Sequence, residues 1–234
     1  MSAREPAIVL DGASKAFGPK RAVDGVTLRI PSRSTYGLIG PNGAGKTTTF
    51  SLIAGYLQPS QGTVRVLGAT PGNVPALRGR LGVLPQDALL PGRERVGAFL
   101  VHLARLQGLT PAHAERAARA ALDEVDGASF WTQRCGALSH GMAKRVGLAQ
   151  ALLGNPEVVL LDEPTAGLDP KIAHDVRDVL RRRKGAMTLL VSSHNLSELE
   201  SLCDGAAILD KGRLVTDGTM AELTRATEEV RVLL

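Results

Sequence analysis

Two adjacent carboxylates, Asp162 and Glu163, come directly after an aliphatic run in the stretch EVVLLDEPTAGLDP, residues 157–170. The four residues 158–161 are typical of a buried strand. Two like charges at the end of such a strand are costly to bury unless a cation lies beside them. The stretch therefore indicates either a site for a compensating cation or, more simply, a strand that ends at the protein surface.

A second stretch, YGLIGPNGAGKTTTF at residues 36–50, matches the spacing of a phosphate-binding loop between a strand and a helix. Glycines let backbone amides wrap phosphates, and the N-terminus of the following helix adds a positive dipole end. In such loops the lysine reaches the terminal phosphates and the hydroxyl after it ligates magnesium. The loop predicts nucleotide binding by Gly40, Pro41, Asn42, Gly43, Ala44, Gly45, Lys46, Thr47 and Thr48.

The phosphate loop changes how the two carboxylates are interpreted, because a nucleotide brings magnesium with it. In folds of this kind the strand before the loop and an aliphatic strand that ends in Asp are usually neighbours. We therefore expect Asp162 to hold magnesium, directly or through water, together with Thr47. Glu163 would then accept a proton from the attacking water or orient that water.

Short aliphatic or alternating runs predict strands, and segments of helical periodicity lie between them. The predicted strands cover residues 7–10, 26–30, 36–39, 63–67, 81–84, 158–161, 188–192, 206–209 and 213–215, with a hairpin turn at Lys211 and Gly212. The predicted helices cover residues 46–54, 93–107, 111–124, 141–153 and 170–184, with Thr110 and Asp169 as N-caps. A capping box at Thr219 and Glu222 predicts a C-terminal helix.

This alternation predicts an α/β fold with a P-loop NTPase core, in which flanking helices cover a mostly parallel sheet. The strand-rich first 70 residues are expected to add an N-terminal antiparallel β layer. We expect a single domain over residues 1–234, with its core at about 1–86 and 155–234. The residues between them, about 87–154, are expected to form a helical subdomain.

The composition of the 234 residues, 44% hydrophobic and 22% charged, is that of one large folded domain. The net charge of +5 fits a nucleic-acid surface, contact with a membrane or an anionic ligand, or a basic exterior. The densest basic run, RRRK at residues 181–184, follows a helical segment and is expected to be its last turn. No aromatic residues are interleaved with it, as binding of single-stranded nucleic acid would require.

Two cysteines without metal-ligand spacing indicate no disulfide framework, and a reducing cytoplasm fits them. The first residues lack the apolar core of a signal peptide. No apolar run approaches the roughly 18 residues that cross a bilayer. We therefore expect a soluble chain that reaches a membrane only through a partner.

In this order, the motifs resemble those of the nucleotide-binding subunit of an ATP-binding cassette (ABC) transporter, over essentially the whole chain. Gln86 in VLPQD is similar to the Q-loop glutamine of that family, and LSHGMAKR occupies the place of the signature motif before VVLLDEP. TAGLDP resembles the D-loop, with Asp169, and SSHN resembles the switch-histidine motif, with His194. Phe17 in KAFG lies where an aromatic ring usually stacks on adenine.

The signature motif departs from the usual LSGGQ, because His140 replaces a glycine and Met142 a glutamine. Ser139 and Gly141 are kept, which supplies a hydroxyl and a residue without Cβ at a helix N-terminus that can approach phosphate. An S-x-G-M form followed by basic residues resembles the drug, polysaccharide and multidrug exporter branch more than the sugar and amino-acid importers.

The resemblance implies ATP and magnesium as cofactors and a homo- or heterodimer of cassettes that sandwiches two ATP molecules. Gln86 would sense magnesium and the γ-phosphate, His194 would contact the γ-phosphate, and Ser139 and Gly141 would act on the ATP held by the other subunit. A polytopic transmembrane subunit would be the transport partner, docked near Gln86 and the following LLPGRERVGAF, residues 89–99. The chain would then lie peripherally on the cytoplasmic face of the inner or plasma membrane, with no nucleic-acid partner.

Other classes of P-loop protein fit the sequence less well. A soluble cassette ATPase acting on DNA or ribosomes fits the basic charge, but chromosome-type cassettes carry long coiled-coil insertions, and translation-type chains usually carry two cassettes. Only 51 residues lie between Gln86 and Leu138, without sustained heptads, and there is one phosphate loop. An importer subunit is a further alternative. A GTPase would need an N-K-x-D motif, which is absent, and neither a GTPase nor a small-molecule kinase explains LSHGM.

Overall fold

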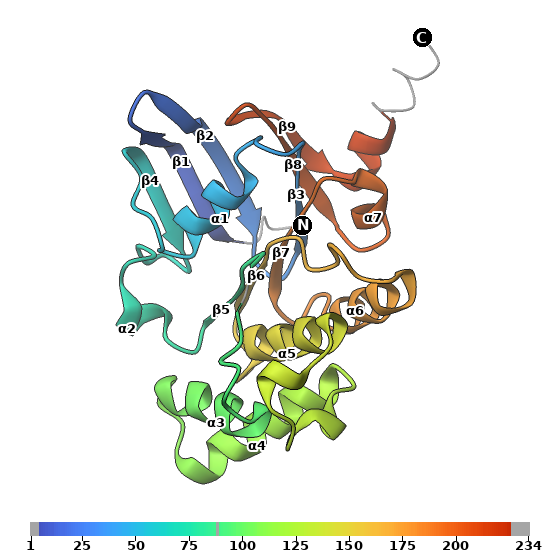
Figure 1. The fold of residues 1–234 in the computed structure, drawn as a ribbon. Coiled ribbons are helices and arrows are strands. Elements are labelled where there is room, and N and C mark those ends of the chain that lie inside the picture. Colours follow the sequence, from blue (N-terminus) through green and yellow to red (C-terminus); the bar gives the residue numbers. More distant parts are fainter. Residues whose placement is uncertain (1–4, 88, 226–234) are drawn as a thin grey trace. The chain divides into compact units, whose positions relative to one another are not determined.

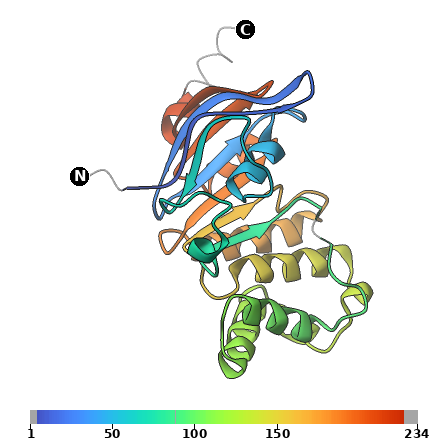
Figure 2. The same ribbon diagram turned by 90° about the vertical axis from the view of Figure 1, so that its left-hand side faces the viewer.

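The computed structural model describes residues 5–87 and 89–225, and the chain divides into two compact units (Figures 1 and 2). One unit consists of Met1–Leu77 together with Lys184–Leu234, and the other of Arg78–Arg183. The first unit contains the phosphate loop, and the second contains the two adjacent carboxylates and the signature stretch.

The first unit is built on two sheets. An antiparallel sheet has the strand order β2-β1-β4, and in a second sheet β3 pairs in parallel with β7 and β8, while β9 pairs antiparallel with β8. The strands are β1 (Pro6–Phe17), β2 (Lys20–Pro31), β3 (Thr35–Ile39), β4 (Gln61–Val66), β7 (Thr188–Ser193), β8 (Gly205–Asp210) and β9 (Arg213–Thr219). The helices are α1 (Lys46–Ile53), α2 (Val74–Leu77) and α7 (Leu196–Glu200). The antiparallel sheet confirms the predicted N-terminal β layer.

Two local signals near the end of the described chain behave as predicted. The β8–β9 hairpin turns at Lys211 and Gly212, whose φ angles of 46° and 82° are those that a tight hairpin requires. Thr219 and Glu222 form a reciprocal capping box, in which the Thr219 amide donates to the Glu222 carboxylate at 2.9 Å and the Glu222 amide donates to the Thr219 hydroxyl at 3.3 Å. Residues 220–225 are helical, and any continuation of the predicted C-terminal helix lies outside the described residues.

The second unit combines a parallel strand pair with helices. Its elements are β5 (Leu81–Leu84), α3 (Val96–Leu106), α4 (Pro111–Glu124), two short 3-10 turns (Ala128–Phe130 and Cys135–Ala137), α5 (His140–Leu152), β6 (Val158–Leu161) and α6 (Pro170–Arg182). Helices α3, α4 and α5 contact one another, and α5 also packs on β5 and β6. The Trp131 ring is enclosed here, because a Cβ on Gly97 would lie 2.5 Å from it and the Arg119 guanidinium lies 4.0 Å from its centroid.

The predicted α/β class is confirmed, with corrections at element ends. Helix α3 begins at Val96 rather than at residue 93, because Pro91 and Glu94 close a turn (Glu94 N to Pro91 O, 2.9 Å) and Arg95 is extended. Helices α2 and α7 were not predicted. Within residues 5–87 and 89–225, no helix has both the length and the apolar character needed to cross a membrane.

Candidate nucleotide-binding site

The phosphate loop of the first unit joins the buried strand β3 to α1. The Lys46 side chain, 6% exposed, turns back across the loop and donates hydrogen bonds to the Gly40 carbonyl at 2.7 Å and the Pro41 carbonyl at 3.3 Å. Thr47 is exposed in the first turn of α1, where backbone amides have no acceptor within the helix. The loop thus presents an ammonium group, a hydroxyl and helix-start amides together, which is the donor set that phosphate requires.

Two glycines of the loop are required by close packing as well as by phosphate. A Cβ on Gly40 would lie 2.4 Å from the Leu209 carbonyl oxygen, and one on Gly45 would lie 2.5 Å from the Ala22 carbonyl oxygen. Gly45 also has a φ of 102°, which side chains rarely adopt. Strands β2 and β8 therefore press directly on the loop and hold its shape.

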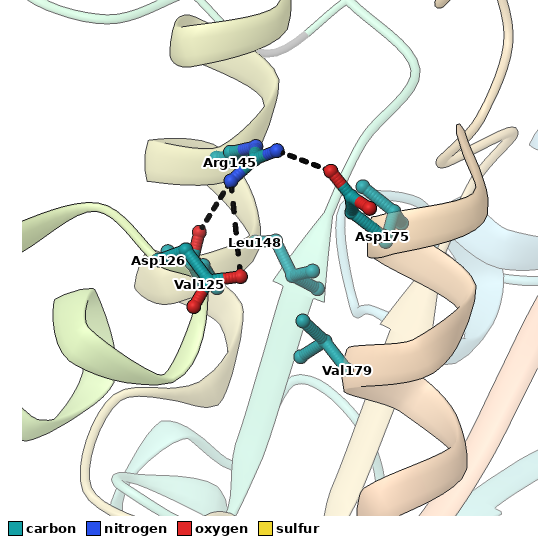
Figure 3. A pocket seen from close by; sticks show the side chains of 7 residues that line it. Val125, Asp126, Arg145, Leu148, Asp175 and Val179 are labelled. Carbon is teal, nitrogen blue, oxygen red and sulfur yellow. Dashed lines mark hydrogen bonds and ion pairs between the residues drawn. The ribbon is translucent and has the colours of Figure 1, made fainter. Parts of the chain in front are cut away.

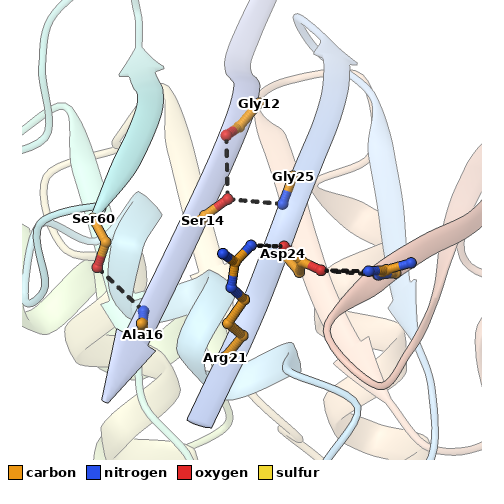
Figure 4. A network of polar contacts seen from close by, with 8 residues as sticks. Gly12, Ser14, Ala16, Arg21, Asp24, Gly25 and Ser60 are labelled. Atoms are coloured by element: carbon orange, nitrogen blue, oxygen red, sulfur yellow. Dashed lines mark hydrogen bonds and ion pairs between the residues drawn. The ribbon is translucent and has the colours of Figure 1, made fainter. Parts of the chain in front are cut away.

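The β8–β9 hairpin connects the phosphate loop to β2 through hydrogen bonds. The Asp24 amide donates to the Gly212 carbonyl at 2.8 Å, and the Gly212 amide donates to the Ala44 carbonyl at 2.9 Å. Arg21 and Arg213 both donate to the Asp24 carboxylate at 2.8 Å (Figure 4), and these two hydrogen bonds lower the pKa of Asp24. The contacts link the loop, the hairpin and β2 into one continuous support.

His194 lies beside the phosphate loop at the carboxyl edge of this sheet. Strands β3 and β7 are parallel with Ile39 opposite Ser193, so Gly40 and His194 are the first residues after two neighbouring strands. The turn after β7 is held by Ser193, whose hydroxyl accepts from the Asn195 amide and donates to Glu198, both at 3.0 Å. The topology therefore brings the predicted switch histidine to the loop.

Phe17 ends β1 with a side chain that is 49% exposed. The Lys15 ammonium lies 5.4 Å from the centre of its ring. An exposed ring at the end of a strand leaves a face that could stack on a base.

In the second unit the acidic pair follows β6, whose four residues are all buried. Strands β5 and β6 are parallel with Leu84 opposite Leu161, and the Asp162 amide donates to the Leu84 carbonyl at 2.9 Å. Asp162 and Glu163 are 2% and 7% exposed, and Glu163 has the unusual φ of 50°. Gln86 comes two residues after β5 and is exposed, so the predicted Q-loop glutamine follows the strand that pairs with β6.

The signature stretch opens α5. Ser139 is the N-cap, and its hydroxyl accepts from the Met142 amide at 3.3 Å. A Cβ on Gly141 would lie 2.6 Å from the Ile172 Cδ1, so the start of α5 packs closely on the tip of a side chain of α6. The His140 Nε2 lies 3.4 Å from where a Cβ on Gly167 would be, which places the imidazole against the TAGLDP loop.

Arg145 ties the signature helix to its surroundings (Figure 3). Its guanidinium donates to the Asp175 carboxylate of α6 at 2.7 Å and to the Val125 carbonyl at 3.3 Å, and lies 3.9 Å from Asp126. Asp169, the predicted D-loop acid, is the N-cap residue of α6 as predicted, although its side chain makes no capping hydrogen bond. The start of α5 is therefore held by α6 and by the end of α4.

The predicted site residues fall into two groups, one in each unit. The first unit contains the phosphate loop and His194, and the second contains Gln86, Asp162 and Glu163, with Ser139 and Gly141 at the start of α5. Sequence patterns did not single out Lys144, which lies on the face of α5 toward β5 and β6. Its position could be anticipated only from helical spacing, because it is three residues from Gly147 on that face.

Replacing Ser139 by alanine tests whether its hydroxyl only caps α5 or also contributes to ATP hydrolysis. We expect Ser139→Ala to lower the free energy of unfolding by about 1 kcal/mol, because the cap of α5 is lost. Thr110→Ala is the matched control, since Thr110 is the N-cap of α4 but makes no capping hydrogen bond, and it should change stability by less. Thermal unfolding and ATP hydrolysis are measured on both. A Ser139→Ala variant that hydrolyses ATP as fast as Thr110→Ala would leave Ser139 with a structural role only.

Comparisons with known proteins match the chain over most of its length. A family model described as "ABC transporter" matches residues 23–166, and a second model, of an AAA domain, matches residues 134–200. The chain is 36% identical over 234 residues to "Daunorubicin resistance ATP-binding protein DrrA3" of Streptomyces coeruleorubidus, covering 97% of this chain and 73% of that protein. It is 35% identical over 224 residues to "Nod factor export ATP-binding protein I" of Paraburkholderia xenovorans, covering 94% and 73%. A solved structure of an "ATP binding subunit of ABC transporter" superposes with a TM-score of 0.84 at 27% identity and covers 95% of this chain and 93% of that one.

Proposed function

Because the chain belongs to the ATP-binding subunits of ABC transporters, we propose that it hydrolyses ATP to power solute export through a separate membrane subunit. Cassettes of this family are ATPases and pair with membrane subunits. The direction of transport is supported by the names of two relatives, a daunorubicin resistance protein and a Nod factor export protein, and by the S-x-G-M signature.

The buried acidic pair at the end of β6 is the observation that carries the catalytic part of this proposal. Asp162 and Glu163 are 2% and 7% exposed, and the Asp162 amide donates to the Leu84 carbonyl at 2.9 Å, so the pair follows the carboxyl end of the parallel strands β5 and β6. Buried carboxylates at the carboxyl edge of a parallel strand pair suit the handling of magnesium and water. The matching edge of the first unit holds His194 beside Gly40.

The residues of the site fit ATP with magnesium by their chemistry. Hydroxyl, carboxylate and amide oxygens, from Thr47, Asp162 and Gln86, are ligands that magnesium accepts. When bound, the ion neutralises charge on the phosphate oxygens as the γ-phosphate leaves. Lys46 and the amides of the loop hold the phosphates, with Thr48 in the first turn of α1.

The remaining roles follow from the placement of each residue. Glu163 orients the attacking water and accepts its proton, and His194 contacts the γ-phosphate. Phe17 stacks on adenine. Ser139 and Gly141 act, with Asp169, on the nucleotide of a second cassette in a homo- or heterodimer. ATP then closes the dimer and hydrolysis releases it.

The whole cassette is proposed as a single domain of residues 1–234, with a core at about 1–86 and 155–234 and a helical subdomain at about 87–154. Docking to the membrane subunit is assigned to the surface at Gln86 and residues 89–99. Leu89 supports this assignment, because a leucine that is 93% exposed is a ready apolar anchor for a partner. The cassette would thereby lie on the cytoplasmic face of the inner or plasma membrane.

Affinity capture from detergent-solubilised native membranes tests the transport assignment. We expect recovery of a polytopic membrane protein in roughly equal amount. Leu89→Asp should lose that protein, while Leu106→Asp, at an exposed leucine (61%) that ends α3, should retain it. Capture only from the soluble fraction, bound to nucleic acid or ribosomes, would leave the ATPase chemistry intact and overturn the transport assignment.

A further inference from the structure

Two segments of the second unit, residues 92–97 and 131–136, lie side by side as a short antiparallel ribbon, called here the arginine ribbon. Its central bridge pairs Arg95 with Arg134. Two backbone hydrogen bonds flank this bridge, Cys135 N to Glu94 O at 2.8 Å and Val96 N to Gln133 O at 3.0 Å. The two arginines are therefore a non-hydrogen-bonded pair, the arrangement in which facing side chains of two strands come closest.

Close backbone contacts hold the arginine ribbon at both ends. At one end the Gly136 amide donates to the Gly92 carbonyl at 3.0 Å, and a Cβ on Gly136 would lie 2.9 Å from the same oxygen. At the other end the Gly97 amide donates to the Trp131 carbonyl at 3.0 Å. The two facing arginines therefore project from a backbone that is fixed on both sides of them.

The fold does not neutralise the charge of the arginine ribbon. Arg95 and Arg134 are exposed, and Arg95 donates to a neutral acceptor, the Thr132 carbonyl, at 3.0 Å. Within residues 5–87 and 89–225, no carboxylate forms an ion pair with either of them or with Arg93, a third exposed arginine of the ribbon. Like charges on directly opposite residues of a strand pair are destabilising, so the stability of the fold does not explain this pair.

The chemistry of this surface fits an acidic polypeptide. Each guanidinium can bind a carboxylate through two parallel N–H groups. Leu89, three residues before the ribbon and 93% exposed, offers an apolar contact beside the charges. The ribbon carries three arginines and one glutamate, fewer basic residues than the roughly four to eight that recognise anionic lipids. Interfaces with nucleic acid are polar and strongly basic, which would leave the exposed leucine unexplained.

We propose that the arginine ribbon binds an acidic segment of the membrane subunit, with carboxylates paired to Arg95 and Arg134 and an apolar side chain packed on Leu89. The inference rests on the proposed function, because it takes residues 89–99 as part of the docking surface. It extends that surface to residues 131–136 and gives the partner's segment a charge. Opposite charges on the two surfaces would favour the correct partner and its correct orientation.

A photo-reactive cross-linker at position 89 identifies the segment that docks. Leu89 is replaced by p-benzoyl-phenylalanine, which keeps the position apolar, and the full chain is mixed with detergent-solubilised native membranes and irradiated. Mass spectrometry then identifies the cross-linked peptide. We expect a polytopic membrane protein, linked in a segment that carries two or more carboxylates near the linked residue. A linked segment without carboxylates would overturn the inference.

Charge reversal measures what the facing arginines contribute to capture of the membrane protein. We expect Arg95→Glu with Arg134→Glu to reduce the amount captured by at least about tenfold relative to wild type. The matched control is Arg105→Glu with Arg116→Glu, which reverses two exposed charges on α3 and α4 of the same unit and should capture as much as wild type. An equal loss in both double variants would make the effect one of overall charge and overturn the inference.

Thermal unfolding of each variant checks that the fold is kept. Arg95→Gln with Arg134→Gln removes the charges without adding carboxylates, and it carries the test if the reversed variant fails to fold. Replacement of the partner's cross-linked carboxylates by lysine should restore capture by Arg95→Glu with Arg134→Glu and weaken capture by wild type. Absence of this rescue would overturn the pairing of charges.

The outcomes separate the inference from the proposed function. Failure of wild type to capture any polytopic membrane protein would overturn the proposed function, and the inference with it. Capture that charge reversal leaves unchanged would overturn only the inference. Phosphatidylglycerol vesicles are the probe for a lipid ligand. If charge reversal abolishes binding to these vesicles but not capture of the membrane protein, the arginines serve lipid headgroups and the inference is overturned.

Discussion

Replacement of Glu163 by glutamine is expected to slow ATP hydrolysis by about two to three orders of magnitude, with ATP affinity within about threefold of wild type. Glutamine keeps the shape of the side chain but cannot accept a proton from water. Glu163 is 7% exposed and is the second residue after β6, so its side chain is buried close to the end of that strand. The loss should therefore fall on the chemical step.

Three measurements check this prediction: phosphate release under single-turnover conditions, binding of a fluorescent ATP analogue, and size-exclusion chromatography with ATP. An ATP-bound dimer should accumulate in Glu163→Gln, because closure needs ATP and reopening needs hydrolysis. Glu157→Gln is the matched control, since Glu157 precedes β6 and pairs with Arg80 on the surface. Equal hydrolysis rates in Glu163→Gln and Glu157→Gln would remove Glu163 from its role.

Much of the fold could be predicted because its signals are local. Strands β5 and β6 and helix α4 have the predicted bounds, since short aliphatic runs and a Thr-Pro start are strong patterns. Helices α2 and α7 have four and five residues, too short to show a helical period. Strand β1 extends well beyond the predicted residues 7–10, because its second half pairs with β2 although it carries few aliphatic residues.

Within the candidate site, the sequence predicted which residues belong to contiguous motifs. It could not predict the contacts that each of these residues makes. The phosphate-loop motif predicts glycines because they let the backbone approach phosphate. The structure adds a second reason for glycine at Gly40 and Gly45, because a Cβ at either position would clash with a backbone carbonyl group. Gly141 likewise packs against the side-chain tip of Ile172 of another helix. The contact of α5 with β5, where a Cβ on Gly82 would lie 1.9 Å from the Ala151 carbonyl oxygen, could not be predicted, because no single stretch of sequence encodes how a helix lies on a strand.

The contact between the phosphate loop and β2 predicts a large loss of stability when Gly45 is replaced. We expect Gly45→Ala to lower the free energy of unfolding by about 3 kcal/mol, because the new Cβ would lie 2.5 Å from the Ala22 carbonyl oxygen and the φ of 102° is unfavourable for alanine. For a protein of this size that corresponds to a fall in Tm of about 6–12 °C. ATP affinity should fall by more than tenfold, since relief of the clash moves the amides that hold the phosphates.

Gly43→Ala is the matched control for the packing effect. Gly43 has a φ of 82°, but a Cβ there would have nothing within 4 Å, so the substitution carries only the backbone cost of about 1 kcal/mol. Both variants are compared by thermal unfolding without nucleotide, because both residues belong to the loop that is proposed to hold the phosphates. A fall in Tm that is three times larger for Gly45→Ala than for Gly43→Ala would mean that β2 fixes the conformation of the phosphate loop in the absence of ATP. Equal falls would mean that backbone conformation alone requires the two glycines, and that the Ala22 carbonyl oxygen can move aside.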